Sequence, residues 1–211
     1  MGTLLNYLTT KPKNVFGFDI SWSRLKFAKH FLADTNVDNV RLFTANLFEI
    51  PLLDNSIDIV YTSHSIEPNG GKEEEALKEL YRVTKNYLVL LEPSYEFAND
   101  EARLRMKHHG YVTQLYATAK KMNYKIIEHR LFDFSVNPLN PTGLIIIEKN
   151  EIKANKPDLV CPISKTSLVK INDNMLYSNE SYLAYPILES IPCLLKENSI
   201  LAIHLQTNYE K

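Results

Sequence analysis

The residues best suited to proton transfer follow an apolar run near the middle of the first half of the chain. His64 and Glu67 stand just after Ile57–Ser63 (IDIVYTS), which is nearly continuous in apolar residues. Because an imidazole gains and loses a proton near neutral pH, His64 can serve as a general base. Glu67 could orient His64 or bind a substrate. The structural alternative is that His64 caps the strand and Glu67 is solvated.

Polar residues also end two earlier strand-like runs. Asp19 closes the run at residues 14–19 (NVFGFD), and Asn46 follows the run at residues 40–45 (VRLFTA). In an open parallel sheet, ligands bind beyond the carboxyl ends of the strands. A carboxylate there can accept hydrogen bonds from both hydroxyls of a ribose, which favours a nucleotide-containing cofactor. The alternatives are a capping or loop acid at Asp19, a simple strand-to-loop junction at Asn46, and a nicotinamide cofactor.

The sequence offers little support for a metal site. His108 and His109 are adjacent, so their side chains diverge on a helix, and no third ligand stands nearby. The two cysteines, Cys161 and Cys193, give no disulfide framework, and we expect free thiols in a reducing cytoplasm.

Composition narrows the class of partner. The chain has 211 residues and a formal net charge of −1, so no basic surface for a nucleic-acid backbone is expected. No apolar run approaches the length of a membrane span, and the start lacks a signal-peptide pattern. We therefore expect neither a nucleic-acid nor a membrane partner. The oligomeric state stays open.

Strand-like and helical patterns alternate over the first 150 residues. Strands are predicted at 14–19, 40–45, 57–63 and 87–91, and helices at 72–83 and 112–122. A further helix follows Ser21, with Trp22, Leu25, Ala28 and Leu32 on one face. Alternation of this kind predicts an α/β fold with a mostly parallel, doubly wound sheet. Strands at 125–132 and 144–149 have no helix between them, which predicts an antiparallel edge.

A polar stretch at residues 151–158 (EIKANKPD) separates the alternating strand and helix patterns from a region with a different sequence pattern. We expect one domain at residues 1–150 and a second at residues 156–211. The second has short β-like pieces and a turn at residues 172–174 (NDN), so it is predicted to be small and β-rich.

The segment from Asn46 to Val60 carries a family resemblance. Pro51 is followed by residues 54–60 (DNSIDIV), which is similar to the run P-(x)n-D-x-S-F-D-x-V of class I S-adenosylmethionine-dependent methyltransferases. The resemblance covers residues 2–149 and implies a Rossmann-like fold with S-adenosylmethionine as cofactor. It also implies cofactor contacts, namely the ribose at Asp19, the adenine face at Ile20, the adenine amino group at Asn46 and the ring edge at Leu47.

Two positions depart from that family's pattern. Asn46 replaces the commoner aspartate, although an amide oxygen can still accept from an amine. Family members open with a strand and a turn of the type D-x-G-x-G-x-G, whereas this chain begins Met1-Gly2-Thr3. Gly2 would then be the last glycine of the turn, in contact with the cofactor, and the central first strand would be missing. Alternatively, the chain is complete and Gly2 is only an N-terminal residue.

Catalytic residues in this family follow the fourth strand, which is where His64 and Glu67 stand. Glu92 and Tyr95 stand after the next strand, where they would also face the acceptor. The structural alternative is that Glu92 is a loop acid and Tyr95 a packing side chain. The resemblance implies methyl transfer to a small-molecule or glycan-type acceptor. The alternative is a non-catalytic binding or scaffold protein derived from a methyltransferase. A nicotinamide oxidoreductase is disfavoured by the run at 46–60.

The C-terminal region resembles a second family. Residues 159–168 (LVCPISKTSL) and 183–195 (LAYPILESIPCLL) are similar to the zinc-ribbon-like activator of tRNA and protein methyltransferases. Ser164 replaces the second cysteine of the C-x-x-C pair, and Ser178 lies near the expected third. Structural zinc needs four nitrogen or sulfur ligands, so we expect a ribbon without zinc. Such a domain needs other support, and we expect it to pack on the methyltransferase domain through Tyr182, Tyr185, Ile187 and Leu194.

Overall fold

A computed structural model describes residues 12–34, 39–151, 153–203 and 205. Gly2, predicted to contact the cofactor, lies outside these residues. Two compact units emerge. The first unit comprises the described residues up to Pro51 and from Leu159 onward, and the second unit comprises Leu52–Asp158. The chain thus passes from one unit to the other twice, the second time at the end of the polar stretch 151–158. The division into residues 1–150 and 156–211 remains a proposal.

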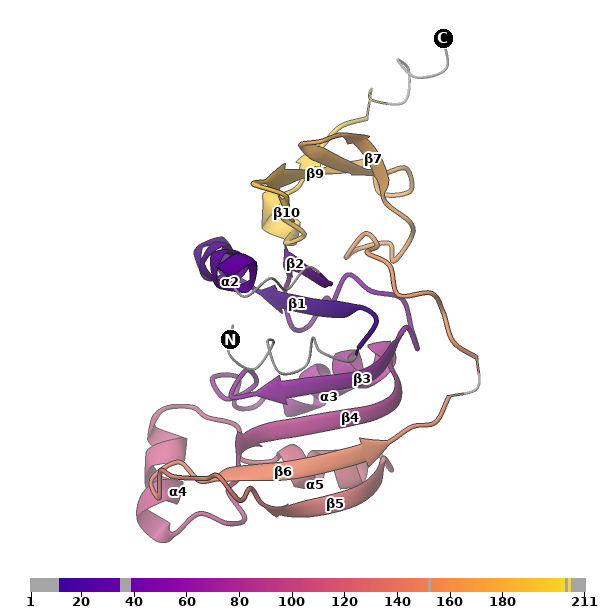
Figure 1. The fold of residues 1–211 in the computed structure, drawn as a ribbon. Coiled ribbons are helices and arrows are strands. Elements are labelled where there is room, and N and C mark those ends of the chain that lie inside the picture. Colours follow the sequence, from indigo (N-terminus) through magenta and orange to yellow (C-terminus); the bar gives the residue numbers. More distant parts are fainter. Residues whose placement is uncertain (1–11, 35–38, 152, 204, 206–211) are drawn as a thin grey trace. The chain divides into compact units, whose positions relative to one another are not determined.

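The first unit begins with a βαβ segment (Figure 1). Strands β1 (Val15–Asp19) and β2 (Val40–Thr44) pair in parallel, with Asp19 opposite Thr44 at their carboxyl ends. Helix α2 (Trp22–Asp34) lies between them in sequence and buries Leu25, Ala28 and Leu32. These are three of the four positions predicted from the helical spacing of apolar residues, and the fourth, Trp22, is half-buried against the same core.

The C-terminal part of the first unit is a small antiparallel sheet, so the β-rich character is confirmed. Its order is β10-β9-β8-β7, with β11 on β9. A 3-10 helix, Lys196–Asn198, precedes the last strand. The strands are β7 (Val169–Asn172), β8 (Met175–Ser178), β9 (Leu183–Leu188), β10 (Ile191–Pro192) and β11 (Ile200–Leu201).

This small sheet is attached to β2 and α2. The Leu194 amide donates to the Thr44 carbonyl at 3.1 Å, and the Lys26 ammonium lies 2.7 Å from the Glu189 carboxylate. Ile191, 1% exposed, belongs to the same apolar core as Leu25 and Leu42. The C-terminal segment therefore completes the hydrophobic core around the βαβ segment.

The predicted packing residues of this segment divide into two groups. Tyr185 and Leu194 are buried, as expected of a packing surface, and Ile187 is half-buried. Tyr182 is 42% exposed, so it is not part of a buried packing surface in the first unit, contrary to the expectation that it packs on the methyltransferase domain. Ile191, which the sequence analysis left out, fills the core instead, because β10 brings it against α2.

The second unit contains a four-stranded sheet in the order β3-β4-β6-β5. Its strands are β3 (Ile57–Ser63), β4 (Thr84–Pro93), β5 (Lys125–Leu131) and β6 (Thr142–Glu148). β3 and β4 are parallel, whereas β6 runs antiparallel to both β4 and β5. The predicted antiparallel edge is thereby confirmed.

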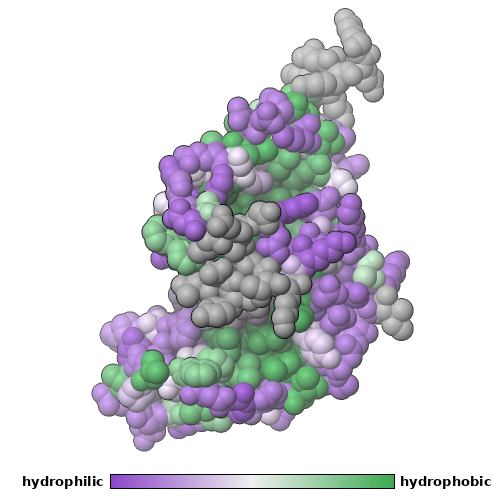
Figure 2. Space-filling model, viewed as in Figure 1, coloured by the Kyte–Doolittle hydropathy of each residue, from purple (hydrophilic) through white to green (hydrophobic). Residues whose placement is uncertain are grey.

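Helices α3 (Glu73–Val83) and α5 (Leu115–Lys121) lie behind this sheet in Figure 1. Leu88 and Leu90 of β4 are fully buried, whereas Val89 and Leu91, which alternate with them, are half-buried. Figure 2, drawn from the same side, shows hydrophobic residues along the near face of the sheet. Within the described residues, α3 and α5 thus cover one face of this sheet, and the opposite face is apolar.

Helix α4 (Asp100–His108) was not predicted from the sequence. The side chain of Asn99 caps it by accepting a hydrogen bond from the Ala102 amide at 2.9 Å. Asp100 and Glu101 occupy its first turn, where the helix dipole favours acids. A capping asparagine followed by two acids was therefore the signal that could have located this helix.

The mixed α/β fold is confirmed, and the parallel strands of the described residues form two separate sheets. In the ladders of the described residues, β1 pairs only with β2, and β3 pairs only with β4 along its length. No helix in the described ranges has the length and apolar character needed to cross a membrane.

Candidate active site

The turn after β3 fixes the position of His64. Its backbone amide donates to the Leu91 carbonyl at 2.9 Å, which ties it to the end of β4. The φ angle of His64 is 50°, in the left-handed region that few non-glycine residues adopt. Residues held in this region commonly sit at functional sites, because the surrounding structure must stabilise them. The backbone turns sharply at the residue that the sequence marks as a base.

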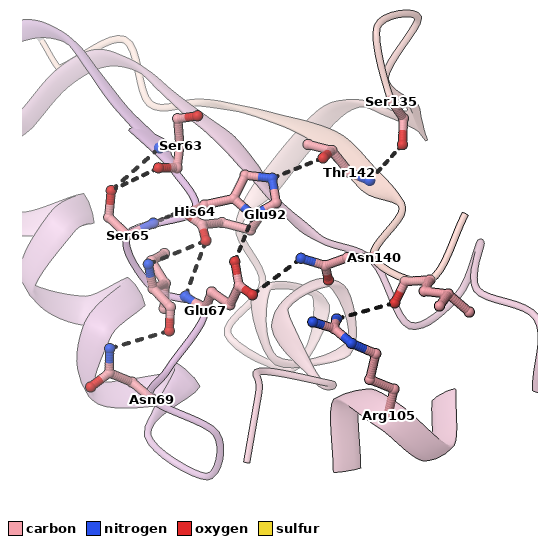
Figure 3. A network of polar contacts seen from close by, with 12 residues as sticks. Ser63, His64, Ser65, Glu67, Asn69, Glu92, Arg105, Ser135, Asn140 and Thr142 are labelled. Atoms are coloured by element: carbon pink, nitrogen blue, oxygen red, sulfur yellow. Dashed lines mark hydrogen bonds and ion pairs between the residues drawn. The ribbon is translucent and has the colours of Figure 1, made fainter. Parts of the chain in front are cut away.

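Both ring nitrogens of His64 are hydrogen-bonded (Figure 3). Nδ1 lies 2.6 Å from Oε2 of Glu67, and Nε2 lies 2.8 Å from Oγ1 of Thr142 at the start of β6. The structure thus brings together the two residues predicted to act as a pair. The Glu67 side chain is only 14% exposed, so the alternative of a solvated carboxylate is wrong.

A second contact fixes the Glu67 carboxylate. Its Oε1 accepts a hydrogen bond from Asn140 Nδ2 at 3.1 Å, while Oε2 faces His64. Because a carboxylate only accepts hydrogen bonds, Nδ1 of His64 carries a proton, and in the neutral imidazole Nε2 then presents its lone pair. Asn140 lies in the proline-containing loop before β6, so this loop contributes to the site. Glu67 therefore fixes the orientation of the imidazole ring.

The buried carboxylate of Glu92 fixes the backbone of the loop that follows His64. This side chain is 3% exposed, and it accepts hydrogen bonds from the amides of Ser65, Ile66 and Glu67 at 3.0, 3.2 and 3.1 Å. Burial raises the pKa of Glu92, while the backbone donors oppose that shift. The Glu92 side chain therefore binds the backbone of the loop at residues 65–67. The expectation that it faces the acceptor site is wrong.

Tyr95 behaves as a packing side chain. Its ring lies against Arg103 and Lys107 of α4, at 5.2 and 5.4 Å from the ring centroid. It is half-buried beside the small core of α4 that contains Ala98 and Met106. Of the two interpretations of Tyr95 that the sequence left open, the structural one fits these contacts.

Asp19 closes β1 in the first unit, as predicted. Its Oδ1 accepts a hydrogen bond from the Ser21 amide at 2.8 Å, and Oδ2 lies 3.7 Å from Nη1 of Arg24. The carboxylate therefore stabilises the start of α2. Each carboxylate oxygen has two lone pairs, so these contacts leave acceptor capacity for a ribose. Its side chain is 10% exposed, beside Ile20, which is 67% exposed.

Asn46 and Leu47 lie at the matching end of β2. Asn46 Oδ1 accepts from the Phe48 amide at 3.0 Å, and the Ala45 amide donates to the Asp19 carbonyl at 3.2 Å. Leu47 is half-buried in the turn. The four predicted cofactor residues in the described ranges thus stand at the carboxyl ends of two adjacent parallel strands. A partly exposed carboxylate beside an exposed aliphatic side chain suits a ligand with hydroxyls and a flat ring.

A separate depression of about 520 Å³ lies along α5 and β5 of the second unit. Its lining includes Tyr116 and His129, whose rings are stacked at 3.7 Å. Burial lowers the pKa of His129. No residue of the His64 network lines this depression, so it is not part of the candidate active site.

Comparison with known proteins agrees with this arrangement. Residues 1–90 match the family described as "Methyltransferase domain". No curated protein matches the chain.

Several solved structures share the fold at low identity. A SAM-dependent methyltransferase from Methanosarcina mazei is 17% identical, with a TM-score of 0.57 over 69% of this chain and 86% of that one. One from Aquifex aeolicus is 15% identical, with a TM-score of 0.54 over 69% of this chain and 74% of that one. Magnesium protoporphyrin IX methyltransferase from Synechocystis, solved with bound SAH, is 15% identical, with a TM-score of 0.55 over 70% of this chain and 69% of that one. The match over residues 1–90 supports a methyltransferase domain in that part of the chain, and the solved structures, all under 25% identical, show a shared fold.

Proposed function

We propose that this protein transfers a methyl group from S-adenosylmethionine to a hydroxyl of a small-molecule or glycan-type acceptor. The observation that carries the proposal is the His64 ring, held at both nitrogens by Glu67 and Thr142. A hydroxyl acceptor must lose its proton as the methyl arrives, and an oriented imidazole is suited to receive it. A positioned base of this kind typically contributes about 10²–10⁴-fold to the rate.

Cofactor binding is assigned to the first unit. Asp19 would accept hydrogen bonds from the ribose hydroxyls, and Asn46 would meet the adenine amino group. Ile20 and Leu47 would pack on the ring, and Gly2 would approach the methionine part. The bound cofactor would supply an electrophilic methyl group on a sulfonium.

The C-terminal segment is proposed to be a zinc-ribbon-like stabiliser without zinc. Cys161 and Cys193 are both free and buried, which suits a reducing compartment, and we propose a cytoplasmic location. The near-neutral net charge favours a small acceptor over RNA.

Cofactor binding is tested first, because it does not require the acceptor. We expect calorimetric titration of the wild-type protein with S-adenosylhomocysteine to show saturable binding. Asp19→Ala should weaken that binding by about 1–3 kcal/mol, the scale of a lost charged hydrogen bond. His64→Asn should bind equally well and serves as the matched control. Equal affinity of wild type and Asp19→Ala would remove Asp19 from the cofactor site.

Turnover is then measured as S-adenosylhomocysteine release in a screen of sugars and small hydroxy metabolites. We expect His64→Asn to lose about 10²–10⁴-fold in kcat, because an amide keeps a hydrogen bond but cannot take the proton. Full turnover by His64→Asn would show that proximity and orientation carry the reaction and that His64 is not the base.

A further inference from the structure

We infer that Thr142 is the group that meets the acceptor hydroxyl and passes its proton to His64. This inference rests on the proposed function. It is drawn from the hydrogen bonds of the His64 ring: Nδ1 lies 2.6 Å from Glu67 and Nε2 lies 2.8 Å from Thr142. In this arrangement the base nitrogen of His64 reaches an acceptor only through the hydroxyl that already occupies it.

The direction of each hydrogen bond follows from the chemistry of the groups. Glu67 only accepts, so Nδ1 of His64 donates to it, and in the neutral ring Nε2 is the unprotonated nitrogen. Thr142 must then donate its hydroxyl proton to Nε2. Both lone pairs of Oγ1 remain to accept a hydrogen bond from another hydroxyl. Thr142 is half-buried and the His64 side chain is 36% exposed, so the pair borders solvent.

The backbone of Thr142 is fixed at three points. Its amide donates to Ser135 Oγ at 2.9 Å, its carbonyl accepts from the Phe132 amide at 2.9 Å, and it stands opposite Pro93 in the β4–β6 ladder. A threonine is also stiff at χ1 because it is branched at Cβ. The hydroxyl therefore has a defined position before any substrate binds, which lowers the cost of ordering it in the reaction.

The step balances in atoms and charge. The acceptor oxygen forms a bond to the methyl carbon as the sulfur–carbon bond breaks. The acceptor proton moves to Thr142 Oγ1 while the Thr142 proton moves to Nε2 of His64. The positive charge that leaves the sulfonium appears on the imidazolium, where the Glu67 carboxylate lies 2.6 Å away. Thr142 ends the step as a neutral hydroxyl.

The tautomer of His64 tests the inference without cofactor or acceptor. We expect nitrogen-15 NMR of the unliganded protein above the titration of the ring to show Nδ1 protonated and Nε2 hydrogen-bonded. Thr142→Val, which keeps the shape without the hydroxyl, should shift only the Nε2 resonance toward that of a free nitrogen, and Thr142→Ser should leave it unchanged. A proton on Nε2 in the wild-type protein would overturn the inference, because the ring would then donate to Thr142.

Kinetics provide the second test, with the best acceptor from the sugar and metabolite screen. We expect Thr142→Val to lower kcat by about 100-fold or more without changing S-adenosylhomocysteine affinity, and Thr142→Ser to stay within a few-fold. The wild-type proton inventory in mixed H₂O and D₂O should curve, because two protons move together. A linear inventory, or full turnover by Thr142→Val with His64→Asn inactive, would refute the transfer through Thr142 alone. Full turnover by His64→Asn would refute the proposed base itself.

Discussion

The sulfur of Cys161 and the hydroxyl oxygen of Ser181 lie 3.4 Å apart in the first unit. They belong to two short segments of equal spacing, Cys161-x-x-Ser164 and Ser178-x-x-Ser181. A second contact links the segments, because the hydroxyl oxygens of Ser164 and Ser178 are also 3.4 Å apart. Hydrogen bonds therefore hold these four side chains together in the C-terminal segment.

Restoring cysteines should turn this cluster into a zinc site. Tetrahedral zinc with Zn–S bonds of about 2.3 Å separates its sulfurs by about 3.8 Å, close to the separations of the present pairs. We expect the variant Ser164→Cys/Ser178→Cys/Ser181→Cys to bind one zinc per chain and the wild-type protein to bind far less. Elemental analysis of protein purified without chelator measures this directly.

The matched control adds Cys161→Ser to the triple variant, which removes the fourth sulfur and should lower zinc affinity. Stoichiometric zinc in the wild-type protein would contradict the proposal of a ribbon without metal. Failure of the folded triple variant to take up zinc would contradict the proposed arrangement of the four positions.

Cys161 should make the stability of the protein depend on pH. Burial opposes ionisation of this thiol, but hydrogen bonds from Ser164, Ser181 and Tyr185 outweigh it and lower the pKa of Cys161 to about 6. An unfolded cysteine titrates near pH 8.5. A lowered folded-state pKa contributes stability that is fully present above the unfolded pKa and is lost as pH falls through about 6. The free energy of unfolding should therefore gain a favourable contribution between pH 6 and pH 9.

Chemical denaturation of the wild type and Cys161→Ala at pH 6 and pH 8.5 measures this contribution. The wild type should gain stability relative to the variant as the pH rises. Cys193→Ala is the control, because burial raises the pKa of that thiol and no such gain is expected. A difference between wild type and Cys161→Ala that stays constant over this range would show that Cys161 remains a neutral thiol.

Local patterns made much of the candidate site predictable. Asp19 and Asn46 follow apolar runs that become β1 and β2, and parallel pairing brings such positions to one edge. His64 and Glu67 are three residues apart, so their contact needed only a turn. Thr142 lies 78 residues from His64, and Asn140 lies 73 residues from Glu67. Nothing local marks either residue, because the antiparallel return of β6 creates both contacts.

The same distinction explains the errors in the fold. The helical spacing of Leu25, Ala28 and Leu32 was sufficient to predict α2 and its buried face. Tyr182 was expected to pack on the methyltransferase domain, yet its φ of 55° places it at a turn before β9, where it stays exposed. Burial of a residue in the C-terminal segment depends on which part of that segment packs against α2. This is a tertiary contact, and the spacing of apolar residues in the sequence does not predict it.

Ile191 should be essential to the stability of the first unit. It is 1% exposed and packs with Leu25 and Leu42, from which it is separated by 166 and 149 residues in sequence. Ile191→Ala should lower the free energy of unfolding by about 2–5 kcal/mol, through lost apolar burial and the cavity that remains. Ile200→Ala, at a position that is 64% exposed, should change it by less than about 0.5 kcal/mol. Denaturant titration of the two variants tests the difference, and equal losses would show that β10 does not complete this core.

Glu92 should stabilise the loop that presents His64. Its two oxygens accept hydrogen bonds from three consecutive amides, so Glu92→Gln places an NH₂ group against at least one backbone donor. A buried donor without an acceptor costs about 1–3 kcal/mol, and we expect a loss of that size at pH 7. Glu101→Gln, on the exposed face of α4, should be nearly neutral. The loop should also lose order, so the nitrogen-15 resonances of His64 should broaden in Glu92→Gln alone.

The pH dependence of this variant has a definite sign. Because burial raises the pKa of Glu92, the folded protein holds its proton to higher pH than the unfolded chain does. The stability that this group contributes is then fully present below the unfolded pKa and declines as pH rises through the folded one. The advantage of the wild type over Glu92→Gln should therefore be larger at pH 4.5 than at pH 7. Denaturation at the two pH values measures it, and an advantage that grew toward pH 7 would mean that the three amides outweigh burial and keep the carboxylate ionised.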